Sequence, residues 1–198
     1  MSRRLIIAVS GTPGTGKSLF AAELARKIGA ELVDLNTLIK ESGIYEVDEN
    51  GVRVVDPEDL RREFSRVSKG IRGDLVVEGL LAHLLPTDEV THVVVLRTAI
   101  EELERRLLAR GYPERKLREN LEAEALGIIL CEAVQEHGED KVHEIDTTSL
   151  DPPEAVELFL SALRGEVSLR PGKIDWLEEY CDKYFRSETP RGGKKFNP

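Results

Sequence analysis

Three glycines, a lysine and a serine near the start of the chain have the types and spacing that suit a phosphate group. Residues 11–18 read Gly-Thr-Pro-Gly-Thr-Gly-Lys-Ser and fit G-x-x-x-x-G-K-[ST] in full. The glycines let backbone N–H groups converge on one phosphate, and the helix that follows points its positive end at the same anion. Lys17 can reach the β- and γ-phosphates, and the Ser18 hydroxyl can ligate Mg²⁺. The motif predicts a nucleoside triphosphate site with Mg²⁺, formed with Gly14, Thr15 and Gly16.

A carboxylate ends the buried-type run Asp74–Val77, where Glu78 and Gly79 follow. In a sheet whose first strand feeds the phosphate loop, an acid at the end of an adjacent strand lies next to the metal. We therefore expect Glu78 to hold Mg²⁺ through water or to accept a proton, the alternative being a solvated acid at a strand end. We expect His83, alone in an apolar stretch, to be a packed side chain.

Arg106 and Arg110 are four residues apart and share one face of a predicted helix. The breaker Gly111-Tyr112-Pro113 follows, and then three more cations: Arg115, Lys116 and Arg118. Guanidinium groups on a mobile segment could cover a transferring phosphoryl group and exclude water. We predict a lid near residues 109–119; the alternative is that the cations only complement a helix end.

The acceptor of the phosphoryl group must bind opposite the triphosphate, and the insertion after the second predicted strand is the expected place. Asp34 begins it, and Lys40 is the nearest cation able to hold an acceptor phosphate, unless it is a solvated surface lysine. Arg97 follows a buried run and is expected at the ligand-binding edge of the sheet. Asp146 and Thr147, after the last predicted strand, could cradle the base of ATP or form a plain turn.

Apolar runs that alternate with helical patterns must position these residues. The predicted strands are Leu5–Val9, Glu31–Asp34, Asp74–Val77, His92–Leu96 and Val142–Ile145. The predicted helices are Ser18–Ile28, Pro57–Val67, Ile100–Arg110, Glu114–Gln135 and Pro153–Leu163. This alternation predicts an α/β fold with a five-stranded parallel sheet covered by helices on both faces.

Two segments depart from the alternation. Residues 41–56 carry an Asp-Glu-Asn-Gly turn between apolar residues, which indicates a hairpin-like insertion. We assign residues 1–164 to one domain and residues 165–198 to a C-terminal extension, with a short helix over Ile174–Phe185 and a basic disordered tail, Thr189–Pro198.

Composition narrows the function classes. The 198 residues include 28 Lys+Arg and 37 Asp+Glu, a net charge of -9, which argues against a surface built mainly to hold nucleic acid. The longest aliphatic run, Leu5–Val9, is far shorter than the roughly 20 residues needed to cross a bilayer. Two cysteines without metal-site spacing indicate reduced thiols, so we expect a cytoplasmic protein with no membrane partner.

The sequence resembles the adenylate kinase isoenzyme 6 family, which includes the human coilin-interacting nuclear ATPase and archaeal-type adenylate kinases. The resemblance rests on residues 11–18, Asp34, the Val-Glu-Gly at 77–79, the Val-Leu-Arg-Thr at 95–98, and the Asp-Thr-Thr at 146–148. Its most specific part is Arg110-Gly111-Tyr112-x-x-x-Lys116-Leu117-x-x-Asn120, and it covers roughly Leu5–Leu163.

The resemblance implies a P-loop nucleoside-monophosphate-kinase core with strand order 2-3-1-4-5. It places a monophosphate-binding region near residues 34–57 and a lid near 109–119, with Lys40 in place of the arginine that binds the acceptor phosphate. It implies contacts to ATP from Gly14, Gly16, Lys17, Ser18 and Arg110. It also implies Mg²⁺-dependent transfer from ATP to AMP with ATPase activity, and a role in maturing the small ribosomal subunit.

One departure concerns the acid-x-histidine pair that the family often has after its third strand. Here the residues are Glu78-Gly79-Leu80, so the histidine is absent. Three hypotheses remain. The first is an AMP phosphotransferase. The second is an assembly ATPase, with a ribosomal protein of the small-subunit platform as partner and a transient rRNA contact. The third is a P-loop kinase for another small metabolite.

Overall fold

A computed structural model describes residues 4–49, 51 and 53–186. A five-stranded parallel sheet forms the centre, with strands in the order β2-β5-β1-β6-β7. The bounds of these strands are β1 Ile6–Gly11, β2 Glu31–Asp34, β5 Leu75–Glu78, β6 His92–Arg97 and β7 Val142–Asp146. Counted along the chain without the small hairpin, this order is 2-3-1-4-5, so the predicted sheet and its order are confirmed.

Helices cover both faces of the sheet because β1, β5 and β6 are buried apolar runs that expose side chains to both sides. On one face, α1 (Lys17–Ile28) and α7 (Pro152–Leu163) pack in a core that contains Phe20 and Phe159. On the other face lie α2 (Leu35–Ser42), α3 (Pro57–Gly70), the short 3₁₀ turn η1 (Ala82–Leu84) and α6 (Ile128–His137). His83 in η1 is buried, as predicted for a packed side chain.

The single helix predicted over Glu114–Gln135 is wrong, because the chain forms two helices there. These are α5 (Glu114–Ala125) and α6, and Gly127 between them adopts a φ of 60°. A side chain is strained at that φ, so glycine ends the first helix and redirects the chain. The apolar pattern continues across Gly127, which is why periodicity alone did not reveal the break.

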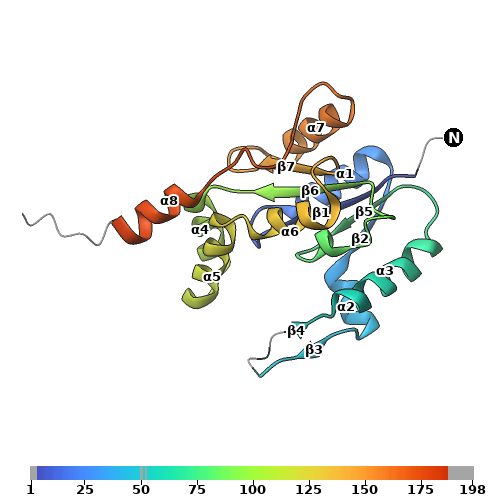
Figure 1. The fold of residues 1–198 in the computed structure, drawn as a ribbon, viewed down its shortest axis with the longest axis horizontal. Coiled ribbons are helices and arrows are strands. Elements are labelled where there is room, and N and C mark those ends of the chain that lie inside the picture. Colours follow the sequence, from blue (N-terminus) through green and yellow to red (C-terminus); the bar gives the residue numbers. More distant parts are fainter. Residues whose placement is uncertain (1–3, 50, 52, 187–198) are drawn as a thin grey trace, which may run out of the picture.

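The remaining elements lie away from the sheet. The strands β3 (Glu46–Val47) and β4 (Arg53–Val54) pair antiparallel, confirming the predicted hairpin-like insertion, which projects from the molecule in Figure 1. α4 (Ile100–Ala109), α5 and α8 (Leu177–Cys181) gather at the left of the view in Figure 1, and a π-helical turn, Asp182–Arg186, follows α8. The predicted tail Thr189–Pro198 lies outside the described residues.

No helix among residues 4–49 and 53–186 is long and apolar enough to span a bilayer.

Candidate active site

Parallel pairing brings the carboxyl ends of the strands to one edge of the sheet. Gly11 of β1 is in register with Leu96 of β6, and Asp34 of β2 with Glu78 of β5. The same register puts Arg97 opposite Asp146 of β7. Ligands of open parallel sheets bind at this edge, so the residues singled out from the sequence share one region.

The phosphate loop, residues 11–18, joins β1 to α1 in the expected strand-loop-helix order. Gly14 has a φ of 99°, and a Cβ there would lie 2.7 Å from Leu103 Cδ1 of α4. Gly16 is the residue before α1, so the first N–H groups of α1 face the loop. Thr15 is fully buried, and its hydroxyl donates to the Thr12 carbonyl at 2.9 Å, which fixes the curl of the loop.

Lys17 is folded back onto the loop. Its Nζ donates to the Gly11 carbonyl at 2.8 Å and to the Thr12 carbonyl at 3.2 Å. Burial lowers the pKa of Lys17 to about 8, opposed by the negative charges of Glu78 and Glu124 and assisted by Arg110. The ammonium is therefore held at a cost in solvation that a bound phosphate would relieve.

Ser18 and Glu78 meet beside the loop. The Ser18 hydroxyl donates to Glu78 Oε1 at 3.0 Å, and Glu78 is buried. A hydroxyl and a carboxylate side by side are hard oxygen donors, which fit Mg²⁺. The part of the chain that the structure describes has no cluster of three or more His, Cys, Asp or Glu side chains that could hold a metal ion.

Two neighbouring cavities open on the loop. One, of about 220 Å³, is lined by Gly14, Thr15 and Gly16, by Arg106 and Arg110, and by Thr147 with the following turn into α7. The other, of about 330 Å³, is lined on its polar side by Lys17, Ser18, Glu78, Arg110 and Asn36. Arg110 lines both cavities.

Arg106 ties the first cavity together. Its guanidinium donates to the carbonyls of Thr147, at 3.0 Å, and Thr148, at 3.2 Å, and its Nη1 lies 3.4 Å from the Gly14 carbonyl. Glu102, one turn earlier on α4, accepts from Arg106 Nε at 2.7 Å. Arg106 therefore joins the phosphate loop to the loop after β7.

Arg97 does not fit the predicted acceptor role. Its side chain is 3% exposed and forms ion pairs with Glu124 at 2.9 Å and Glu144 at 2.8 Å. It lines neither cavity on the phosphate loop. We therefore leave Arg97 out of the acceptor site.

Asp34 and Lys40 are not among the residues that line the second cavity. The Asp34 carboxylate caps α2 by accepting from the N–H groups of Asn36 and Thr37. Lys40 is exposed on the last turn of α2. Their acceptor role stays a prediction, whereas Asn36 of the same helix does line the cavity.

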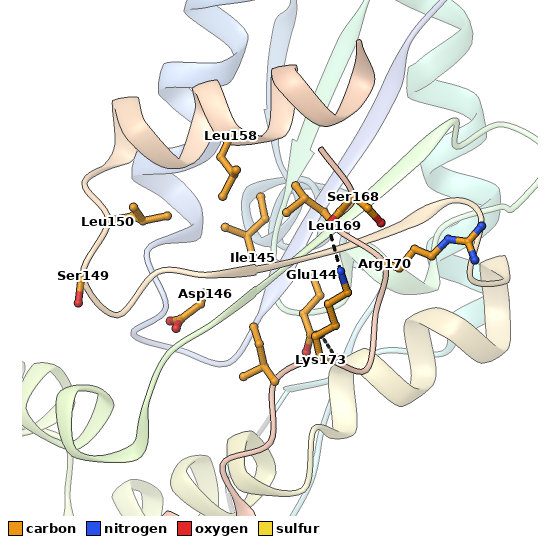
Figure 2. Close-up of a pocket in the computed structure, with 11 residues that line it drawn as sticks. Glu144, Ile145, Asp146, Ser149, Leu150, Leu158, Ser168, Leu169, Arg170 and Lys173 are labelled. Atoms are coloured by element: carbon orange, nitrogen blue, oxygen red, sulfur yellow. Dashed lines mark hydrogen bonds between the residues drawn. The ribbon is translucent and has the colours of Figure 1, made fainter. Parts of the chain in front are cut away.

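Asp146 faces another cavity, of about 400 Å³, between β7, α7 and the C-terminal extension. Figure 2 shows Asp146, Glu144 and Lys173 around it, with Leu150 and Leu158 on the side of α7. The Asp146 carboxylate accepts from Thr148 N at 2.8 Å and so shapes the loop. Of the pair predicted to cradle the base, Thr147 alone lines the cavity beside the phosphate loop.

Sequence reasoning gave no role to Asn36, Leu80 and Tyr112, which line the second cavity, or to Glu124, which is buried behind the loop. The signal for Glu124 was present. Leu117, Leu121 and Glu124 recur at helical spacing on one buried face, so an acid takes a core position.

Known proteins are similar to this one over most of its length. The family profile described as AAA domain matches residues 7–127. The "Putative adenylate kinase" of Thermococcus kodakarensis is 43% identical over 176 residues, which is 89% of this chain and 95% of that protein. The protein of the same name from Pyrococcus furiosus is 38% identical, over 89% of this chain and 93% of that protein. The one from Halobacterium salinarum is 40% identical, over 87% of this chain and 98% of that protein.

Solved structures share the fold at low identity. Shikimate kinase from Bacteroides thetaiotaomicron superposes with a TM-score of 0.58 at 18% identity, over 82% of this chain and 99% of that one. Shikimate kinase from Acinetobacter baumannii in complex with shikimate gives 0.57 at 16% identity, over 82% and 94%. These likenesses show the α/β P-loop kinase fold.

Proposed function

Because the chain belongs to the family of AAA-domain proteins that includes the archaeal proteins named putative adenylate kinase, we propose that it transfers the γ-phosphoryl group of ATP to AMP with Mg²⁺, giving two ADP. The observation that carries the proposal is the placement of Arg110. It lines both the cavity beside the phosphate loop and the cavity that contains Lys17, Ser18 and Glu78. A transferred group passes between two such cavities, and Arg110 can contact it on the way.

In this proposal the adenosine of ATP occupies the cavity that Arg106 and Thr147 help to line, and its phosphates lie in the loop over Gly14, Thr15 and Gly16. Lys17 leaves the Gly11 and Thr12 carbonyls and donates to the β- and γ-phosphates. Ser18 and, through water, Glu78 would hold Mg²⁺. The metal supplies charge neutralisation and a fixed orientation of the phosphate oxygens.

The reaction needs one bond to form and one to break. An oxygen of the AMP phosphate attacks the γ-phosphorus, the bond to the β–γ bridging oxygen breaks, and ADP leaves. Negative charge spreads over the equatorial oxygens, and the fork of Arg110 can contact two of them. Tyr112 and Leu80 line the same cavity and help to exclude water, which would otherwise accept the phosphoryl group.

A coupled assay with AMP, CMP, dAMP and water as acceptors tests the proposal. We expect ADP formation with AMP to exceed hydrolysis and to stop in Lys17→Ala. A rate that does not depend on any nucleoside monophosphate would contradict AMP transfer. Thermal melting of Lys17→Ala is the control for folding, since a collapse of Tm would remove activity without testing the charge.

A second candidate is an assembly ATPase whose kinase activity is incidental. The favouring observation is the scarcity of cations for a second phosphate. Among the described residues that line the second cavity, which contains Ser18 and Glu78, the cations are Lys17 and Arg110, and both are assigned to ATP. In this version ATP hydrolysis releases a ribosomal protein of the small-subunit platform, with transient contact to rRNA in the cytoplasm. A P-loop kinase for another small metabolite is the remaining alternative.

The two candidates differ in what accelerates ATP turnover. An assembly ATPase should hydrolyse ATP faster in the presence of purified small ribosomal subunits and should bind them more tightly in one nucleotide state. Sedimentation with ATP, ADP or no nucleotide measures this. No change in turnover or in sedimentation with any nucleotide would rule the second candidate out.

A further inference from the structure

A buried carboxylate contacts the phosphate loop from the last turn of α5. Glu124 of α5 is 2% exposed, and its Oε2 accepts from the Thr12 hydroxyl at 2.6 Å. Its Oε1 accepts from Arg97 Nε and from the Thr98 N–H, both at 2.9 Å. Both carboxylate oxygens are therefore used, which fixes the Glu124 side chain in one orientation.

Thr12 passes this constraint to the residues that face ATP. Its carbonyl accepts from Thr15 N at 3.2 Å, from Thr15 Oγ1 at 2.9 Å and from Lys17 Nζ at 3.2 Å. The hydroxyl of Thr12 points away from these groups, into the buried carboxylate. A hydrogen bond on one side of Thr12 thus sets the orientation of the peptide that holds Lys17 on the other.

Arg97, which pairs with Glu124, is itself held by Glu144 of β7, the strand at one edge of the sheet. Arg97 Nη1 donates to Glu144 Oε1 at 2.8 Å, and Arg97 Nη2 donates to the Glu124 carbonyl at 2.8 Å. Glu144 Oε2 in turn accepts from the N–H groups of Gly172 and Lys173 in the C-terminal extension. The chain of contacts runs from the C-terminal extension to the phosphate loop, and the three charged side chains in its middle, Arg97, Glu124 and Glu144, are buried.

We propose that Glu124 is a positioning residue for phosphoryl transfer, which holds the phosphate loop through the Thr12 hydroxyl and so sets the place from which Lys17 reaches the phosphates. The inference rests on the proposed function, since it concerns the same loop and the same lysine. It gives Arg97 its role as well: the guanidinium neutralises and orients Glu124. A purely structural ion pair would need Arg97 and Glu124 but would not need the hydroxyl of Thr12.

Thr12 variants separate these readings because they leave the Arg97–Glu124 pair in place. Thr12→Val removes the hydroxyl at nearly constant volume, and Thr12→Ser keeps it. Since Lys17 acts on phosphates whose charge shifts in the transition state, a loosened Lys17 should lower kcat more than it raises the KM for ATP. We expect Thr12→Val to lose about tenfold in kcat/KM, mainly in kcat, as is reasonable for one lost charge-assisted hydrogen bond, and Thr12→Ser to stay within about twofold.

Thr91→Val is the matched control. The Thr91 hydroxyl is half-buried at the opposite end of the same sheet, where it contacts the Ile6 N–H at 3.0 Å and carbonyl at 2.9 Å. Its loss should lower Tm as much as Thr12→Val does and leave kcat unchanged. Glu124→Gln, which keeps the shape of the side chain, should reduce kcat at least as much as Thr12→Val.

The proposal is overturned if Thr12→Val has the kinetics of Thr12→Ser, or if Thr91→Val loses kcat to the same extent. Failure of the proposed function gives a different result, because the parent protein itself would then transfer no phosphoryl group to AMP. In that case the kcat of ATP hydrolysis still compares Thr12→Val with Thr12→Ser. Equal hydrolysis rates would then overturn the positioning role, and a selective loss in Thr12→Val would support it.

Discussion

Replacing Lys17 by methionine should stabilise the protein in the absence of nucleotide and metal while it abolishes activity. The Lys17 ammonium is half-buried, and burial holds its pKa at about 8 against an ordinary value of 10.5. One pH unit corresponds to 1.36 kcal/mol, so charge burial costs up to about 3 kcal/mol at neutral pH. Methionine keeps most of the volume and removes this cost, but it also forfeits the hydrogen bonds to Gly11 and Thr12.

The net gain should be about 1–3 kcal/mol, which for a chain of this size raises Tm by roughly 5 °C. The sign of the pH dependence follows from a folded-state pKa that lies below the unfolded one. The cost is complete below about pH 8 and disappears as the pH rises towards 10.5. The difference in stability between Lys17→Met and the parent protein should therefore shrink over that interval.

Thermal melting in EDTA at several values between pH 7 and pH 10 measures both effects. Lys69→Met, at an exposed position on α3, is the matched control and should shift Tm by little at any pH. A Tm of Lys17→Met equal to or below that of the parent at pH 7 would refute the reasoning. A stability gap that does not close as the pH rises would refute it as well.

Four further outcomes are expected. Arg110→Ala should lower kcat by about 10²–10³-fold with a smaller change in KM. Arg110→Lys should recover little of this activity, because lysine cannot contact two phosphate oxygens at once, and steady-state kinetics with ATP and AMP measures both variants. Glu78→Gln should raise the Mg²⁺ concentration for half-maximal rate, and an unchanged Mg²⁺ titration would mean that the acid is only a strand-end residue. Glu179→Gln should lower the free energy of unfolding, measured in urea, by about 1 kcal/mol, because the Glu179 carboxylate accepts hydrogen bonds from the first N–H groups of α4. The neighbouring substitution Glu178→Gln should lower it by less than half of this. Gly127→Ala should cost about 1–2 kcal/mol in the same assay, because a side chain is strained at a φ of 60°, and an unchanged midpoint would show that the bend between α5 and α6 does not need glycine.

The sheet and the phosphate loop could be predicted because their signals are local. Each buried strand is a short run of aliphatic residues, and the motif at residues 11–18 carries its own geometry. The break at Gly127 was missed because apolar residues continue on both sides, and only the backbone shows that glycine takes a left-handed φ there. The short helix in the C-terminal extension was expected over Ile174–Phe185 and begins at Leu177.

The placement of charged side chains was harder to predict because their partners are distant in sequence. Arg97 at the end of a strand has the position of a ligand-binding residue, but its partner acids come from α5, 27 residues away, and β7, 47 residues away. Arg106, by contrast, lines the cavity beside the phosphate loop, where the sequence predicts it, and its contact with ATP stays a prediction. A sequence pattern shows which face of a helix a charge occupies but not which opposite charge it meets.

Added salt should screen the surface ion pairs of this chain but not the buried ion pairs next to the phosphate loop. At 0.15 M ionic strength the Debye length is about 8 Å, and mobile ions weaken pairs on exposed side chains such as Arg62 and Asp59, which are 78% and 42% exposed. The side chains of Arg97, Glu124 and Glu144 are 1–3% exposed, so counterions have no access to them. Molar salt should therefore weaken helix-surface pairs and nucleotide attraction while the shape of the empty loop persists. Salt would thereby lower the affinity of the loop for phosphate without changing the geometry of the loop.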